Sequence, residues 1–202
     1  MTWYDVKREA LIKMNTVENG DVDMTTEENA NKIAAMPQAV NEALTYITGT
    51  FRPYRKKASA AVDTSEGAKG YAILDIAADY KDCEGCNAYL VDSSGIPQDV
   101  PILVTAEEYL IVPSGYTGTL ILYYNAYPEQ ITRTTADTYE FPYDSDVTSL
   151  LPLYVASEVY KPDDDEAMTN VWRSEFEAAV QNLRARRTGN SATGWYSESG
   201  WC

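Results

Sequence analysis

The sequence predicts an α+β protein, in which both ends of the chain form a core of about four helices and an antiparallel β-sandwich or barrel is inserted between them. Apolar residues recur every three or four positions over residues 1–50 and again over 145–187, which is the spacing of amphipathic helices. Between these segments, short β-branched and apolar runs alternate with turn-forming residues. The two helical ends need one another to bury their apolar faces. We therefore expect residues 1–50 and 145–187 to form one discontinuous domain, with a β domain inserted at 65–143 and an extended tail at 188–202.

The first two helices are indicated by their starts and by their apolar stripes. Thr2 and Asp5 have the spacing of a capping box, and the helix that follows carries apolar side chains at Trp3, Val6, Ala10, Leu11 and Met14. The stretch Thr25-Thr-Glu-Glu28 is expected to cap a second helix, with a stripe at Ala30, Ile33, Pro37, Val40, Leu44 and Ile47. Pro37 is expected to kink or break this helix, and Gly49 to end it. We interpret both stripes as parts of a helical core rather than as a binding surface.

The character of the chain changes at residues 51–70, which carry five basic and two acidic residues. Such a segment suits either a contact with an anion or a solvated linker, and the linker is the favoured interpretation. Short strands are then predicted at Tyr71–Ile76, Ala88–Asp92, Ile102–Thr105, Tyr109–Val112 and Leu120–Asn125. The last of these is apolar on both faces over Leu120–Tyr124, which predicts a central strand. Ile131–Phe141 is expected to run back toward the helices as an extended segment.

Charge and hydropathy exclude some classes of function. The formal net charge is −15, which argues against binding nucleic acid by neutralising its phosphates and favours a surface that repels DNA. Residues 71–145 hold 12 acids and 2 bases, so most of the acidity is expected in the β domain. No apolar run approaches the ~18–20 residues that span a bilayer, and the charged, amphipathic N-terminus is unlike a signal peptide. We expect a cytoplasmic product with no membrane contact.

The stretch from Leu150 to Leu183 predicts two further helices joined by an acidic turn. The third helix, capped by Ser145 or Asp146, has its apolar stripe at Val147, Leu150, Leu151, Tyr154, Val155 and Val159. Pro162 stops it, because a proline disfavours helix in the residue before it. The acids of Asp163–Glu166 then lie at the start of the fourth helix, where the helix dipole favours them. Its buried face is predicted at Met168, Val171, Trp172, Phe176, Ala179, Val180 and Leu183.

The segment after these helices is a candidate for partner binding. The fourth helix ends in three arginines, and the Gly/Ser-rich tail that follows is unusually rich in aromatic residues; the candidate residues are Arg184, Arg186, Arg187, Trp195, Tyr196 and Trp201. A free tail is usually poor in aromatics, whereas tryptophan and tyrosine are common anchors at interfaces. We expect the tail to become ordered on a partner, and a disordered terminus is the alternative.

Motifs for catalysis, metals and cofactors are largely missing from the sequence. There is no histidine, and no nucleophile elbow, phosphate-binding loop or dinucleotide fingerprint occurs. Cys83 and Cys86 form a CxxC pair, but no second pair completes a zinc site, so we interpret them as a coincidence in a loop and leave a local disulfide open. Asp163–Glu166 lacks the spacing of a calcium loop and fits helix capping better. No catalytic residue, metal site or cofactor is predicted.

Residues 150–183, LLPLYVASEVYKPDDDEAMTNVWRSEFEAAVQNL, resemble the C-terminal segment of tailed-phage virion proteins. In that group a helix of the type LLPLYVAS-x-x-Y is followed by an acidic turn and by an aromatic-Arg-x-Glu-Phe-Glu helix, matched here by Trp172, Arg173, Glu175, Phe176 and Glu177. The stretches YYNAYPEQIT and NEALTYI also look like that group. Among its members, the chain is most similar to head–tail connector adaptors, from which its large β insert and aromatic tail depart.

The resemblance implies a structural protein of the phage neck without enzymatic activity. Adaptors of this kind form a ring, commonly of twelve copies, beneath the portal, and their C-terminal segment often reaches into the portal. The implied partners are therefore the portal protein, the next neck or tail protein and further copies of the chain, with DNA passing through the ring without specific binding. The implied location is the virion, after assembly in the cytoplasm of the bacterial host.

Two alternatives to the adaptor remain. One is another tail-completion or decoration protein whose β domain binds a partner or a glycan, an idea motivated by the tyrosine-rich strands. The other is a hydrolase that uses some pair of the 31 acidic residues. Nothing in the sequence singles out such a pair.

Overall fold

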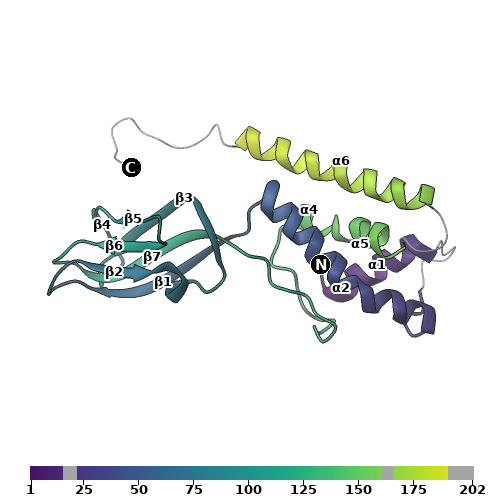
Figure 1. Ribbon diagram of the computed structural model, residues 1–202, viewed down its shortest axis with the longest axis horizontal. Coiled ribbons are helices and arrows are strands. Elements are labelled where there is room, and N and C mark those ends of the chain that lie inside the picture. The colour runs from purple at the N-terminus through teal and green to yellow at the C-terminus, as the bar shows by residue number, and fades with distance from the viewer. Residues whose placement is uncertain (16–21, 161–165, 191–202) are drawn as a thin grey trace. The chain divides into compact units, whose positions relative to one another are not determined.

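The structure, a computed structural model, describes residues 1–15, 22–160 and 166–190. It contains α-helices and antiparallel sheets, so the predicted α+β class is confirmed. The chain divides into two compact units (Figure 1): a helical unit of Met1–Arg52 with Glu129–Cys202, and a β unit of Pro53–Pro128. The helical unit is therefore discontinuous in sequence, and each unit is described separately below.

Five helices are described in the helical unit, and all five contribute side chains to one core. They are α1 (Trp3–Asn15), α2 (Glu27–Thr50), the short α4 (Ser145–Thr148), α5 (Leu151–Val159) and α6 (Glu166–Asn190). Figure 1 shows α5 between its neighbours, and it contacts α1, α2 and α6. The core is made of apolar side chains from both ends of the sequence, among them Leu11, Met36, Leu44, Ile47, Leu151, Val155, Phe176 and Val180.

The helix starts follow the capping chemistry of the sequence. In α1 the Thr2 N–H donates to the Asp5 carboxylate at 2.8 Å, and the Asp5 N–H donates to the Thr2 hydroxyl at 3.1 Å, so the predicted capping box is confirmed. The cap of α2 is Thr26, within the predicted capping stretch Thr25–Glu28, and its hydroxyl accepts from the Asn29 N–H at 3.3 Å. The helix continues through Pro37 to Thr50, so the expected break is absent.

Two side chains of α6 lie off the buried face on which they were predicted. Trp172, Phe176, Val180 and Leu183 are buried, at successive spacings of four, four and three residues. Val171 precedes Trp172 by one position, about 100° around the helix, and its side chain is 45% exposed. Met168 is 39% exposed. The expectation that Val171 and Met168 belong to the core is therefore wrong.

The β unit contains two antiparallel sheets. One has the strand order β1-β7-β3-β4 and the other β2-β6-β5. The elements are β1 (Arg55–Asp63), β2 (Lys69–Ala72), the helical turn α3 (Ile73–Ile76), β3 (Tyr80–Val91), β4 (Pro97–Gln98), β5 (Leu103–Val104), β6 (Tyr109–Val112) and β7 (Thr117–Ala126). Two expectations are corrected, because the supposed linker contains β1 and the strand expected at Tyr71–Ile76 becomes helical at Ile73.

Strand β7 is a central strand of its sheet, as the apolar run Leu120–Tyr124 predicts. It pairs with β1 on one side over nine consecutive residues and with β3 on the other. Leu120 and Leu122 of β7 share a single apolar core with Leu110 and Val112 of β6, so side chains from both sheets are buried together.

Ile131–Phe141, called the extended segment below, lies against the helical unit, but it is not extended throughout: the Thr135 N–H donates to the Thr132 carbonyl at 3.2 Å and the Tyr139 N–H to the Ala136 carbonyl at 3.0 Å, so the segment turns twice. The Trp3 N–H donates to the Tyr139 carbonyl at 2.8 Å, and a single antiparallel bridge joins Thr2 to Glu140. This segment therefore joins the start of the chain to the connection between β7 and α4.

Candidate partner-binding surfaces

The motif that carries the phage resemblance closes α6 onto α5. The Arg173 guanidinium donates to Glu158 at 2.9 Å and to Glu177 at 3.0 Å, and it lies 4.7 Å from the centre of the Tyr154 ring. Burial by itself lowers the pKa of Arg173, but the hydrogen bond to Glu177 and the charge of Glu158 outweigh it and raise the pKa overall. Arg173 is thus a fixed cation that holds the two helices together.

Aromatic rings pack beside this ion pair. The Phe176 ring is completely buried and meets the Tyr154 ring edge-on, with 4.9 Å between centroids. Tyr46 of α2 lies 6.1 Å from the same Phe176 ring, while Trp172 meets Tyr160 edge-on at 5.3 Å. Phe176 therefore joins α2, α5 and α6, and these residues of the motif serve packing.

The extended segment is held by side chains that come from far away in the sequence. Lys7 is 8% exposed and forms an ion pair with Asp137, with its ammonium 5.5 Å from the centre of the Trp3 ring. The Asn41 side chain pairs with the backbone of Ile131 through two hydrogen bonds of 2.8 Å. A buried lysine without a carboxylate is costly, so the Lys7–Asp137 pair ties α1 to the extended segment.

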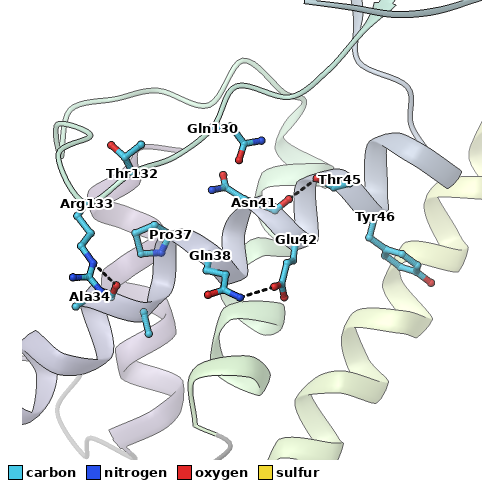
Figure 2. A pocket seen from close by; sticks show the side chains of 11 residues that line it. Ala34, Pro37, Gln38, Asn41, Glu42, Thr45, Tyr46, Gln130, Thr132 and Arg133 are labelled. Atoms are coloured by element: carbon cyan, nitrogen blue, oxygen red, sulfur yellow. Dashed lines mark hydrogen bonds between the residues drawn. The ribbon is translucent and has the colours of Figure 1, made fainter.

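An open groove of about 950 Å³ runs between α2 and the extended segment (Figure 2). The Arg133 Nε donates to the Ala34 carbonyl at 3.1 Å, and the Gln38 amide donates to the Glu42 carboxylate at 3.0 Å. Tyr46 lies at one end of the groove and is 39% exposed. The groove is lined by amides, hydroxyls, one cation and one carboxylate together with the apolar side chains of Ala34, Ala35 and Pro37, a mixture that suits contact with another chain better than a reaction.

A polar network in the β unit centres on Asp79. Its carboxylate accepts from Lys56 Nζ at 2.7 Å and from the Tyr124 hydroxyl at 2.7 Å. Burial, followed by the hydrogen bond to Asp79, raises the pKa of Tyr124 to about 12. Burial also acts to raise the pKa of Asp79, but the bonds from Lys56 and Tyr124 outweigh it, so that pKa is lowered. Both groups keep one charge state near neutral pH and act as structural anchors.

The residues predicted for partner binding lie largely outside the described part of the chain. Helix α6 includes Arg184, Arg186 and Arg187, but the side chains of these arginines are not described. The tail residues Trp195, Tyr196 and Trp201 lie entirely outside the described residues. The predicted helical residues Leu150, Leu151, Tyr154 and Val155 are buried.

Cys83 and Cys86 lie within strand β3 and not in a loop between strands, so that expectation is corrected. They fall where the β3–β7 register shifts, between Asp82 and Asn87. The side chains of both cysteines are outside the described residues, so a disulfide stays an open prediction. Among the residues that the structure describes, no cluster of three or more metal-ligating side chains occurs, and none of the described helices has both the length and the apolar character needed to cross a bilayer.

Several contact residues carried no signal in the sequence. Lys7 and Asp137 are 130 positions apart, and Asn41 and Ile131 are 90 apart, so only the fold brings them together. Strand β1 also carried no signal, because its lysines, alanines and serine are poor strand formers and do not alternate in character along RKKASAAVD.

Comparison with known proteins places the chain in a family. The family model described as SU10 adaptor protein matches residues 1–195. Among solved structures, the chain is similar to a chain of the neck of an empty GTA particle computed with C6 symmetry, at 13% identity, with 85% of this chain and 88% of that chain covered and a TM-score of 0.26. At that TM-score the likeness supports no inference about this chain. No curated protein matches it.

Proposed function

The chain belongs to the SU10 adaptor protein family, and on this premise we propose that its copies form a ring in the neck of a tailed-phage particle. The resemblance to phage head–tail adaptors is thereby confirmed. In our proposal the ring, of about twelve copies by that resemblance, joins the portal protein to the next neck or tail component. DNA passes through the ring without specific binding.

The observation that carries this proposal is the family match over residues 1–195. The contacts of the motif agree with a mechanical role. Arg173 is engaged by Glu158, Glu177 and the Tyr154 ring, and Phe176 is fully buried, so these side chains join helices and offer no free reactive group. A stiff helical unit is what a connector under load requires, and we propose no catalytic step.

Charge supports the proposed DNA passage. The chain carries a formal net charge of −15, and a ring of such copies would surround DNA with negative potential. Like charge weakens adhesion of the phosphate backbone and lets DNA slide. We propose that acidic faces line the passage.

The C-terminal segment is proposed to dock on the portal. Three arginines near the end of α6 and the aromatic residues of segment 188–202 supply charge-assisted hydrogen bonds and apolar anchors, which are the groups that dominate interface energetics. In this proposal the helical unit forms the ring, and the tail attaches it to its neighbour.

Electron microscopy of the full chain tests the ring directly. The protein is imaged alone and with purified portal rings. We expect rings of defined copy number that stack on one face of the portal. Monomers that stay unattached to portal at micromolar concentration would contradict the proposal.

A tail variant tests the docking. The double variant Trp195→Ala with Trp201→Ala is expected to weaken co-purification with portal rings by at least tenfold. A tenfold loss corresponds to about 1.4 kcal/mol of binding free energy, which even a modest aromatic anchor contributes. The matched control is Ser197→Ala with Ser199→Ala in the same tail, which should bind portal normally. Circular dichroism checks that both proteins keep the same helical content. Equal binding by the two proteins would refute tail docking.

One observation favours the alternative of a decoration protein. Tyr89 and Tyr123 stack on neighbouring strands with 6.3 Å between centroids, and Tyr123 is 41% exposed. A flat aromatic pair of this kind suits a sugar ring. Glycan-array binding by the full chain that is lost in Tyr123→Ala but kept in Tyr127→Ala, whose tyrosine is also exposed, would support this alternative.

A further inference from the structure

Strand β1 has a free edge over most of its length. In the order β1-β7-β3-β4 it is the outermost strand, and its only strand partner in the described structure is β7. Its pairing with β7 runs without a bulge from Arg55 to Asp63. A regular outer strand of nine residues is long for an exposed sheet edge.

The hydrogen bonds at its two ends show which backbone groups face away from β7. The Thr64 N–H donates to the Tyr116 carbonyl at 2.9 Å, and the Tyr54 carbonyl accepts from the Ala126 N–H at 2.7 Å. In an antiparallel ladder every second residue bonds to the partner strand, so the even-numbered residues face β7. The odd-numbered residues Arg55, Lys57, Ser59, Ala61 and Asp63 therefore direct their N–H and carbonyl groups outward.

In the part of the chain that the structure describes, one of these five outward positions already has a hydrogen-bond partner. The Asp63 N–H donates to the Tyr71 hydroxyl at 3.3 Å, and that hydroxyl in turn reaches the Asp63 carbonyl at 3.5 Å. A side chain thus caps the C-terminal end of the edge. The other four outward positions keep their donors and acceptors available for an added strand.

The other sheet edges are protected, whereas β1 is open to close approach. β4 has two residues, one of them Pro97, and the neighbouring part of β3 is irregular between Asp82 and Asn87. The edges of the second sheet are short, with four residues in β2 and two in β5. On β1, Ser59 and Ala61 are exposed and small, so they leave room for a strand alongside.

Charge indicates what kind of strand fits. Arg55 and Lys57 are exposed, and neither has an ion-pair partner among the residues that the structure describes. Lys56 between them is paired with Asp79 on the other face of the strand. Two unpaired cations at one end of an open edge favour carboxylates on the incoming segment at that end.

We propose that the β1 edge is a strand-addition site for an extended acidic segment of a neighbouring virion protein. The segment pairs antiparallel to β1, with small residues opposite Ala61 and Ser59 and carboxylates opposite Lys57 and Arg55. The backbone hydrogen bonds of the segment supply the affinity, and its carboxylates determine in which direction the segment runs along β1. This inference rests on the proposed adaptor role, which supplies the neighbouring protein, and adds a second contact besides the tail.

A synthetic peptide provides the probe for the test. The seven-residue peptide SVTVEVE, acetylated and amidated, places Ser, Thr, Glu and Glu opposite Ala61, Ser59, Lys57 and Arg55 in this register. The reversed sequence EVEVTVS has the same composition with its carboxylates at the wrong end and is the control. Each peptide is titrated into the ¹⁵N-labelled full chain, and amide hydrogen exchange is followed residue by residue.

The expected result is specific to alternate residues. SVTVEVE should slow exchange at the amides of Lys57, Ser59 and Ala61 by at least tenfold, while the amides of Ala58 and Ala60, already bonded to β7, stay unchanged. EVEVTVS should bind at least several-fold more weakly. Absence of protection at the three outward amides overturns the proposal, and so does equal binding of the two peptides.

Two kinds of variant separate backbone pairing from charge. Ser59→Pro removes only an outward N–H and should abolish peptide binding, whereas Ala60→Pro removes a bond to β7 and should destabilise the sheet. Arg55→Glu with Lys57→Glu should weaken SVTVEVE about tenfold without any change of backbone. Lys81→Glu, on strand β3 on the other side of β7, is the charge-reversal control and should bind normally. Unchanged binding by the double variant would overturn the proposal even if Ser59→Pro failed to fold.

The same spectra test a second occupant of the edge. If another copy of the chain uses it, the outward amides become protected as protein concentration rises without peptide, and the proposal of a different partner is overturned. Failure of peptide binding leaves ring formation and portal attachment untouched, because electron microscopy measures those separately.

Discussion

Replacing Phe176 with alanine should destabilise the helical unit far more than any change on the outer side of α6. The Phe176 side chain is fully buried and packs against the rings of Tyr154 and Tyr46. Truncation of a buried phenylalanine costs about 3–5 kcal/mol, because apolar contacts are lost and a cavity remains. The total free energy of unfolding of a domain is about 5–15 kcal/mol, so Phe176→Ala would remove a large part of it.

Tryptophan fluorescence in urea measures this effect in the helical unit alone, because none of the four tryptophans lies within residues 53–128. With a slope of about 2 kcal/mol per molar urea, the transition midpoint of Phe176→Ala should fall by about 1.5–2.5 M.

The matched control is Val171→Ala, five positions earlier on the same helix and 45% exposed. It should change stability by no more than about 0.5 kcal/mol, since alanine also has the higher helix propensity. A loss below about 1 kcal/mol in Phe176→Ala, or similar losses in the two variants, would refute this account of the α2–α5–α6 junction.

Three further predictions concern single positions. Gly118→Ala should destabilise the β unit by about 2 kcal/mol or more, because the new Cβ would lie 2.1 Å from the Val91 carbonyl oxygen. Gly67 has the same φ of 154° but open space around it, so Gly67→Ala should cost about half as much stability. Near-ultraviolet circular dichroism in urea measures both losses. Glu108→Gly should stabilise by about 0.5 kcal/mol in the same assay, because Glu108 has a φ of 61°. The hydrogen bond from the Thr2 backbone N–H lowers the pKa of Asp5. The Asp5 carboxylate therefore stabilises the fold fully above the ordinary carboxyl pKa. This stabilisation is lost as the pH falls through the lowered pKa. Asp5→Asn should therefore show a smaller loss of stability in acid than the parent chain in urea titrations at each pH.

Hydrophobic periodicity predicted the helices that bury a regular stripe of apolar side chains over a few turns. Leu151, Val155, Phe176 and Val180 repeat at helical spacing and all are buried, which is why α5 and α6 could be placed from the sequence. Val171 shows the limit of this reasoning. An apolar residue one position away from a core residue is compatible with the same stripe, and only the contacts of the folded helix decide whether it is covered.

Strand β1 could not be predicted, because its reason for being a strand lies elsewhere in the sequence. RKKASAAVD contains few good strand formers, and it becomes a strand by pairing with β7, whose partner residues lie more than fifty positions later. The contacts that hold the extended segment to α1 and α2 could not be predicted for the same reason. Nothing near Lys7 or Asn41 in the sequence identifies Asp137 or Ile131 as its partner.

The division into units also changes where the negative charge lies. The β unit, 53–128, holds ten acids and five bases, a net charge of −5, while the remaining residues hold 21 acids and 11 bases, a net of −10. The expectation that the β domain carries most of the acidity is therefore wrong, because four of the acids counted with it lie after residue 128, in the extended segment and its flanks.

This distribution separates the two electrostatic roles that we propose. Three of the five bases of the β unit stand together at the start of β1, which makes that edge locally basic in an acidic chain. In our proposal the helical unit would then account for most of the repulsion of DNA. The β1 edge would attract the acidic segment. Such exposed pairs are screened over about 10 Å at 0.1 M salt, so peptide binding should weaken as salt rises toward 1 M. Binding that is insensitive to salt would mean that Arg55 and Lys57 do not select the partner.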